Sequence, residues 1–130
     1  MGVADADHDR RQIEQLILAY ATFADRGDGA SMAALFGAEP EIRLPGRNVS
    51  GREKVGRFFG GVRDDPPGTL HVMSNIVIDA DGSDVATSVT YFQVLGAAGP
   101  QAWGRYVDEF RRTDGAWRIA VREVDVLGSA

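Results

Sequence analysis

The chain has 130 residues, the size of one domain, and its composition of 44% hydrophobic and 25% charged residues is typical of a globular protein. The formal net charge of −5 argues against binding to nucleic acid, because phosphate contacts require a clustered basic surface. Cysteine is absent, which excludes disulfides and thiolate chemistry and favours a cytoplasmic location. No apolar run approaches the roughly 20 residues that span a bilayer, so we expect no membrane segment.

Helices are predicted in the first half of the chain. The polar residues 1–8 are expected to form a flexible tail. Apolar side chains recur at helical spacing from Ile13 to Ala24 and predict a first helix over about 9–25, with Asp7 or Asp9 as its cap. Shorter elements follow: a helix over 31–36, a strand over 41–44, a helix over 52–59 and a loop over 60–68.

Strands are predicted in the second half, over 69–79, 85–95, 101–113 and 116–126. Asp-Gly pairs at 81–82 and 114–115 predict hairpin turns, and helices followed by such a meander indicate an α+β domain with an antiparallel sheet. Alternation in the third strand puts four residues on one face, which we predict to be the interior: Gly104, Tyr106, Asp108 and Phe110. In the last strand the predicted core residues are Trp117, Ile119 and Val121.

Four motifs occur in a characteristic order along the chain: Tyr20…Asp25-Arg-Gly-Asp28, Gly51-Arg52-Glu53, His71-Val-Met-Ser-Asn75, and a final hairpin from Gly104 to Arg122. This order resembles the NTF2-like superfamily, especially its SnoaL-like branch, over residues 9 to 126. The resemblance implies a single domain over 1–130, with a curved, cone-shaped sheet around the first helix, a cavity beneath it and a homodimer formed through the outer face of the sheet. The superfamily includes enzymes and non-catalytic binding domains, so the fold alone does not fix the function.

Asp25 and His71 are the leading catalytic candidates. Asp25 ends the first helix, where the alternative role is a helix-end cap, and a His71 ring in an apolar strand needs a polar partner. A carboxylate that accepts the imidazole N–H fixes the tautomer and raises the basicity of the ring. Both residues match positions of scytalone dehydratase and the bile-acid dehydratases, and Tyr20 matches a tyrosine of the latter. The resemblance therefore implies a cofactor-independent, dehydratase-like lyase for a small apolar hydroxy-carbonyl compound.

A second set of residues leaves other functions open. Tyr20 and Asp108 match the oxyanion-hole pair of ketosteroid isomerase, although Arg43 or Leu44 stands where that isomerase has its base. Asp108 could instead form a structural ion pair with an arginine such as Arg122. An isomerase, a polyketide cyclase and a non-catalytic binding or dimerisation module therefore remain as alternatives.

The remaining candidates are substrate-binding residues. Asn75 lies four residues after His71, on the same face if the strand is regular, where it could bind a substrate oxygen; the alternative is a role at a bulge. The complete substrate-binding set is Asn75, Tyr106, Asp108, Arg122, Phe58 and Trp117. Two histidines and no cysteine do not supply a histidine-rich metal site, so we expect no metal and no cofactor. Arg111 and Arg112 are predicted to be solvated.

Overall fold

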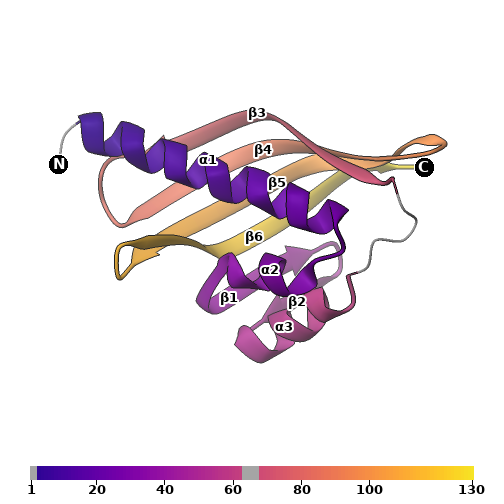
Figure 1. The fold of residues 1–130 in the computed structure, drawn as a ribbon, viewed down its shortest axis with the longest axis horizontal. Helices are drawn as coiled ribbons and strands as arrows, with labels where there is room; N and C mark the ends of the chain where they lie inside the picture. Colours follow the sequence, from indigo (N-terminus) through magenta and orange to yellow (C-terminus); the bar gives the residue numbers. More distant parts are fainter. Residues whose placement is uncertain (1–2, 63–67) are drawn as a thin grey trace.

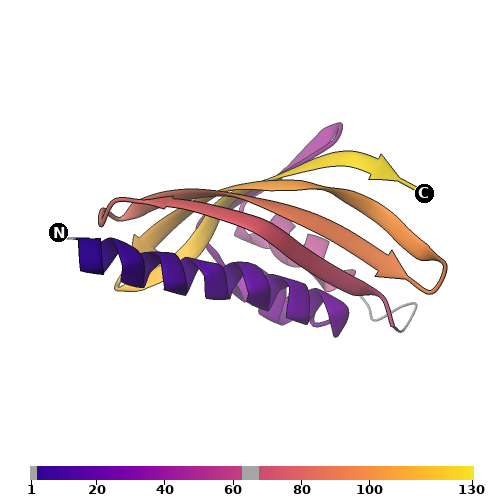
Figure 2. The same cartoon turned by 90° about the horizontal axis from the view of Figure 1, so that it is seen from above.

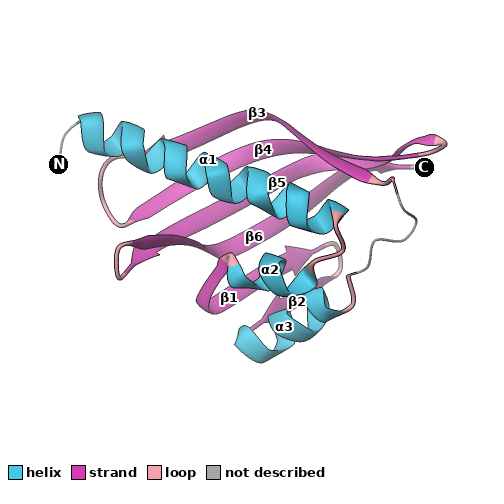
Figure 3. Cartoon of the chain, in the orientation of Figure 1, coloured by secondary structure: helices cyan, strands magenta, loops and turns pink. Residues whose placement is uncertain are grey.

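The computed structural model describes residues 3–62 and 68–130, so residues 63–67 of the predicted loop lie outside the described part. A long first helix leads into a short helix, a small hairpin and a third helix, and four long strands complete the chain (Figures 1 and 3). The elements are α1 (Val3–Asp25), α2 (Gly29–Ala34), β1 (Phe36–Leu44), β2 (Arg47–Ser50), α3 (Arg52–Gly60), β3 (Leu70–Ala80), β4 (Val85–Gly96), β5 (Gly99–Thr113) and β6 (Ala116–Ser129).

The strands form one six-stranded sheet in the order β2-β1-β6-β5-β4-β3, which confirms the predicted α+β class. Strands β3 to β6 are an antiparallel meander, as predicted. At the last turn Asp114 and Gly115 both have positive φ, 52° and 77°, as the Asp-Gly pair predicts. The sheet is not wholly antiparallel, because β1 runs parallel to β6. These two strands are joined by most of the chain, so no hairpin dictates their relative direction.

Helix α1 lies across one face of the curved sheet, while the opposite face carries none of the described helices (Figures 1 and 2). The elements α2, α3, β1 and β2 gather near the C-terminal end of α1 (Figure 1). The buried core lies between α1 and the sheet and continues into this smaller group. Fully buried core residues come from α1, α3, β5 and β6, and they include Ile13, Ile17, Val55, Phe59, Phe110 and Ile119. The interior face of the sheet is therefore the one towards α1.

The first helix begins at Val3 rather than near residue 9, so residues 3–8 are helical and do not form the predicted tail. The contacts of Asp9 explain the longer helix. This residue is only 1% exposed, and its Oδ1 accepts hydrogen bonds from Arg112 Nη1 at 2.7 Å and from the Trp117 indole at 3.2 Å. Asp9 is therefore not a cap but joins α1 to the sheet, and Arg112, which stacks over the Trp117 ring, is not simply solvated.

A β-bulge at Ala120 decides which residues of β6 face the interior. Ile119 and Val121 pair with adjacent residues of β5, so the residue between them is extra and the alternation of faces reverses. Ile119 remains buried, as predicted, but Val121 lies on the outer face opposite Glu109, so its predicted core position is wrong. The same reversal turns Arg122 inwards, where it is 0% exposed.

Candidate functional site

Asp25 and His71 are in direct contact, 46 residues apart in sequence. Oδ1 of Asp25 accepts a hydrogen bond from the backbone N–H of His71 at 2.7 Å and lies 2.9 Å from Nδ1 of its ring. Asp25 is the last residue of α1, and His71 is the second residue of β3, so the pair forms where the end of the helix meets the start of an edge strand. This double contact fixes the position of the carboxylate, because Oδ1 of Asp25 lies within hydrogen-bond distance of two nitrogens of the same residue, His71.

This geometry assigns a tautomer to the imidazole of His71. With Nδ1–H donating to the carboxylate, a neutral ring carries its lone pair on Nε2, which is then free to accept a proton. The side chains of His71 and Asp25 are 21% and 22% exposed, so the pair is partly open rather than sealed in the core. An imidazole oriented in this way by an aspartate is chemically able to act as a general base.

A second cluster surrounds the inward-facing guanidinium of Arg122. Its Nε and Nη2 donate to the two oxygens of Asp108 at 2.8 and 2.7 Å, and both side chains are 0% exposed. The rings of Tyr20 and Tyr106 flank the guanidinium, with centroids 4.2 and 4.1 Å from its central carbon. Arg122 Nη1 is buried without a hydrogen-bond partner within the described part. The predicted residues Tyr20, Tyr106, Asp108 and Arg122 thus form one packed unit.

Burial shifts the ionisation of this cluster. Loss of solvent raises the pKa of Tyr20 above its ordinary value of 10.0, and the charge of Arg122 opposes the shift only in part. The pKa of Tyr106 is also raised, again chiefly by burial. Burial disfavours the charged form of Arg122, but the Asp108 carboxylate outweighs it and holds the pKa of the guanidinium above its usual range. At neutral pH both tyrosines therefore keep their protons and can act as hydrogen-bond donors.

The bidentate contact bears on the isomerase alternative. An oxyanion hole of that kind needs a protonated aspartic acid that donates a hydrogen bond. Both oxygens of Asp108 instead accept hydrogen bonds from Arg122, which is the geometry of an ionised carboxylate. The alternative role foreseen for Asp108, an ion pair with Arg122, is the one observed.

Aromatic contacts connect Phe58 to this cluster. Phe58 is half-buried in α3 and meets the ring of Phe59 edge-on at 5.2 Å, and Phe59 in turn meets Tyr20 at 6.0 Å. On the sheet, Tyr106 stacks on Phe92 at 4.4 Å. Phe92 was not among the predicted site residues, although the alternation of β4 would have placed it on the interior face.

Asn75 does not share the interior face with His71. The register between β3 and β4 shifts between Ser74 and Val77, and Asn75 has a φ of +50° and is exposed. The prediction of a regular strand through Asn75 is therefore wrong, and the bulge foreseen as the alternative is present.

Trp117 also lies away from the pair of Asp25 and His71, which we call the dyad. It is 3% exposed and bonds Asp9, which is 16 residues before Asp25 on α1. At 1.5 Å per helical residue this separation is about 24 Å. Trp117 is therefore a core residue at the other end of the helix, and the structure does not bring it to His71.

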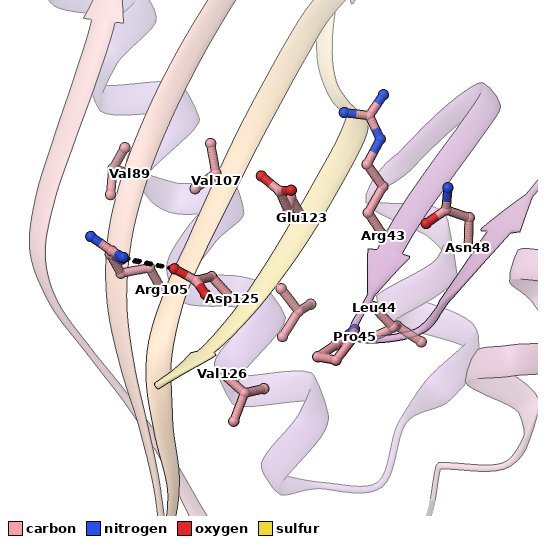
Figure 4. Close-up of a pocket in the computed structure, with 11 residues that line it drawn as sticks. Arg43, Leu44, Pro45, Asn48, Val89, Arg105, Val107, Glu123, Asp125 and Val126 are labelled. Atoms are coloured by element: carbon pink, nitrogen blue, oxygen red, sulfur yellow. Dashed lines mark hydrogen bonds and ion pairs between the residues drawn. The ribbon is translucent and has the colours of Figure 1, made fainter. Parts of the chain in front are cut away.

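The outer face of the sheet carries a cavity of about 700 Å³ between β1, β2 and the central strands (Figure 4). Its lining is mixed, with the Arg105–Asp125 ion pair at 2.8 Å beside the apolar side chains of Val89 and Val107. Helix α1 lies behind the sheet in this view, so the cavity and the dyad are on opposite faces (Figure 4). This outer cavity is not the site that contains His71.

Within the described residues no group of three or more histidine and acidic side chains is placed to hold a metal ion. None of the helices in that part of the chain is both long and apolar enough to cross a membrane.

Comparison with known families agrees with this architecture. The family model for the SnoaL-like domain matches residues 6–123. The chain belongs to the SnoaL-like family. Among curated proteins none matches the chain significantly.

Solved structures share the fold of this SnoaL-like protein over nearly the whole chain. A candidate scytalone dehydratase from Novosphingobium aromaticivorans DSM 12444 is 23% identical, with a TM-score of 0.88 over 99% of this chain and 91% of that one. An NTF2-like protein with a cystatin-like fold from Novosphingobium aromaticivorans is 25% identical, with a TM-score of 0.82 over 95% and 84%. The hexachlorocyclohexane dehydrochlorinase LinA-type3 from Novosphingobium barchaimii LL02 is 18% identical, with a TM-score of 0.82 over 99% and 93%. These similarities confirm the NTF2-like fold.

Proposed function

We propose that this SnoaL-like protein is a cofactor-independent lyase that dehydrates a small apolar hydroxy-carbonyl compound. The observation that carries the proposal is the contact of one Asp25 oxygen with both the backbone N–H and the ring Nδ1 of His71. This contact leaves Nε2 as a proton acceptor of defined direction, which is what abstraction of a proton next to a carbonyl requires.

In the proposed reaction His71 acts first as the base and then as the acid. Nε2 of His71 removes a proton from the carbon next to the carbonyl, and the imidazolium that forms is stabilised by Asp25. The electron pair of the broken C–H bond forms the new double bond as the hydroxyl group departs from the neighbouring carbon. The proton on Nε2 passes to that hydroxyl group, which leaves as water, so His71 returns to its neutral form.

Tyr20 is assigned the carbonyl group of the substrate. It belongs to α1, as Asp25 does, and its raised pKa keeps a proton on the hydroxyl group for donation to the developing enolate oxygen. Arg122 and Asp108 are fully buried, so we assign them the orientation of Tyr20 rather than contact with substrate. Tyr106 and Phe59 supply apolar surface around Tyr20, and Phe58 packs against Phe59.

Two observations favour elimination over the alternatives. The neighbours named as a dehydratase and a dehydrochlorinase are called after reactions that expel a small group and form a double bond. The ion pair of Asp108 with Arg122 removes the protonated acid that an isomerase of the ketosteroid kind would need.

The test is a set of histidine and aspartate variants assayed with an aryl β-hydroxyketone, 4-hydroxy-4-phenylbutan-2-one, whose dehydration product absorbs in the ultraviolet. His71→Ala should lower kcat by roughly 10²–10⁴-fold, the usual contribution of a positioned general base. Asp25→Asn should also lower kcat. The control is His8→Ala, since His8 is the other histidine and is exposed on α1. Turnover that survives both dyad substitutions would contradict the mechanism, and a protein that binds the ketone without turnover would be a binding module.

We also propose a homodimer formed through the outer face of the sheet. Large apolar side chains are exposed there on adjacent strands, among them Val89 and Tyr91 of β4 and Trp103 and Val107 of β5, at 38–46%. Exposed apolar side chains gathered on one face are characteristic of an interaction surface, and the Arg105–Asp125 ion pair lies among them. Light scattering should give twice the 14.0 kDa of the chain, and Val107→Arg should give the monomer mass. A monomer in the unsubstituted protein would contradict the proposal.

A further inference from the structure

A second cavity, of about 330 Å³, lies between β2 and α3 and is lined mainly by cationic and apolar side chains. Arg47 and Asn48 contribute from β2, and α3 presents three side chains of one helical face, Lys54, Arg57 and Phe58. No carboxylate is among its described lining residues. The cavity is therefore a concentration of positive charge on a chain whose formal net charge is −5.

Among the described residues, the ion pairs of this region leave Arg47 and Lys54 without a counter-charge. Arg57 is paired with Glu53 at 2.7 Å. Arg47 has a contact with the ring of Phe58, 5.6 Å from its guanidinium carbon to the ring centroid, and within the described residues neither Arg47 nor Lys54 has an acidic partner. Counted over the described residues, Arg47, Lys54, Arg57 and Glu53 together carry a net charge of +2 beside a hollow that is large enough for a ligand.

The charge and the donor types indicate the class of ligand. A phosphomonoester carries close to two negative charges at neutral pH and three acceptor oxygens, whereas a carboxylate carries one charge. A guanidinium presents a planar fork that matches two phosphate oxygens, and an ammonium supplies a point charge. The side chain amide of Asn48 adds a neutral donor at the rim.

We propose that the cavity formed by Arg47, Lys54, Arg57, Asn48 and Phe58 binds a phosphate group, either as free phosphate or as the phosphomonoester end of an organic ligand. The guanidinium of Arg47 lies over the ring of Phe58, which places this cation beside the cavity without using its hydrogen-bond donors. The site is distinct from the dyad, because neither Asp25 nor His71 is among the residues that line this cavity.

Lys54 supplies a direct reporter because it is the only lysine in the chain. Reductive methylation with ¹³C-formaldehyde keeps its charge and gives one side-chain resonance, with the terminal amine as internal reference. Inorganic phosphate is titrated against this resonance at constant pH and ionic strength, with acetate as the comparison anion. We expect a saturable shift with phosphate only. Arg47→Gln should weaken the phosphate affinity about tenfold or more, because it removes a charge-assisted bidentate contact.

The matched control is Arg11→Gln, which removes the same charge from an exposed position on α1 and should leave the titration unchanged. Phenyl phosphate separates the two sources: tighter binding than inorganic phosphate indicates an organic phosphomonoester, and equal binding indicates free phosphate. A shift that does not saturate, that is the same with acetate, or that is unaffected by Arg47→Gln would overturn the proposal. None of these readouts depends on turnover, so failure of this site and failure of the proposed lyase activity are distinguishable.

Discussion

Removal of the Asp108 carboxylate should destabilise the fold more than an ordinary surface substitution, because Arg122 then remains charged in the core. The guanidinium is 0% exposed and its Nη1 already lacks a hydrogen-bond partner within the described part. Asp108→Ala leaves Nε and Nη2 without acceptors as well. Breaking a buried pair on one side typically costs about 3–5 kcal/mol, a large share of the roughly 5–15 kcal/mol that stabilises a domain.

A double substitution separates this effect from simple loss of packing. Asp108→Leu combined with Arg122→Met removes both charges while keeping apolar volume, and such replacements are often neutral or stabilising by about 1–4 kcal/mol. The free energies of unfolding would be measured by urea denaturation of the three proteins, with an unchanged m-value as evidence that the same fold is compared. If Asp108→Ala costs less than about 1 kcal/mol, or if the double variant is no more stable than the single one, the buried ion pair described here is not what stabilises the site.

Three further predictions concern stability. Because burial raises the pKa of Tyr20 and Tyr106 above 10.0, only the unfolded chain releases these protons near pH 10, so the free energy of unfolding should fall above that pH by about 2.7 kcal/mol per unit for the pair. Denaturant unfolding between pH 9 and 11 measures this pH dependence. If the free energy of unfolding falls as steeply with pH in a variant with both Tyr20→Phe and Tyr106→Phe, the prediction is refuted. A Cβ at Gly29 would lie 1.9 Å from the carbonyl oxygen of Phe59, so Gly29→Ala should cost about 1–3 kcal/mol in thermal unfolding. A Cβ at Gly56 would have no neighbouring atom within 4 Å, so Gly56→Ala should instead stabilise α3 by about 0.5–1 kcal/mol.

Local sequence signals were sufficient for the elements they govern directly. Asp114-Gly115 permits the positive φ angles of a tight hairpin, and the alternation from Gly104 to Phe110 reports which face of β5 is buried. The start of α1 was predicted too late because the residues around Asp9 are polar. The burial of Asp9 depends on Arg112 and Trp117, more than 100 residues later in the chain. No local window contains that information.

The bulges near Asn75 in β3 and at Ala120 in β6 also could not be predicted from the sequence. Strict alternation predicts Val121 for the core and Asn75 for the interior face, and one extra residue in each strand reverses both assignments. The bulge in β6 also turns Arg122 towards Asp108. The same bulge that makes the strand hard to predict therefore forms the buried Arg122–Asp108 ion pair. Bulges near functional sites commonly redirect a side chain in this way.

The dyad depends on the fold in a different way. Asp25 contacts the backbone as well as the ring of His71, so the same carboxylate orients the imidazole and anchors the beginning of β3 to the end of α1. Tyr20 lies five residues earlier on the same helix and is held from the sheet by Arg122. A shift of α1 along its axis would therefore disturb the proposed base His71 and the proposed carbonyl-binding residue Tyr20 together, whereas a change in β6 would reach only Tyr20. The contact of Asp9 with the sheet at the far end of α1 opposes such a shift, so a residue about 24 Å from the dyad helps to keep its geometry.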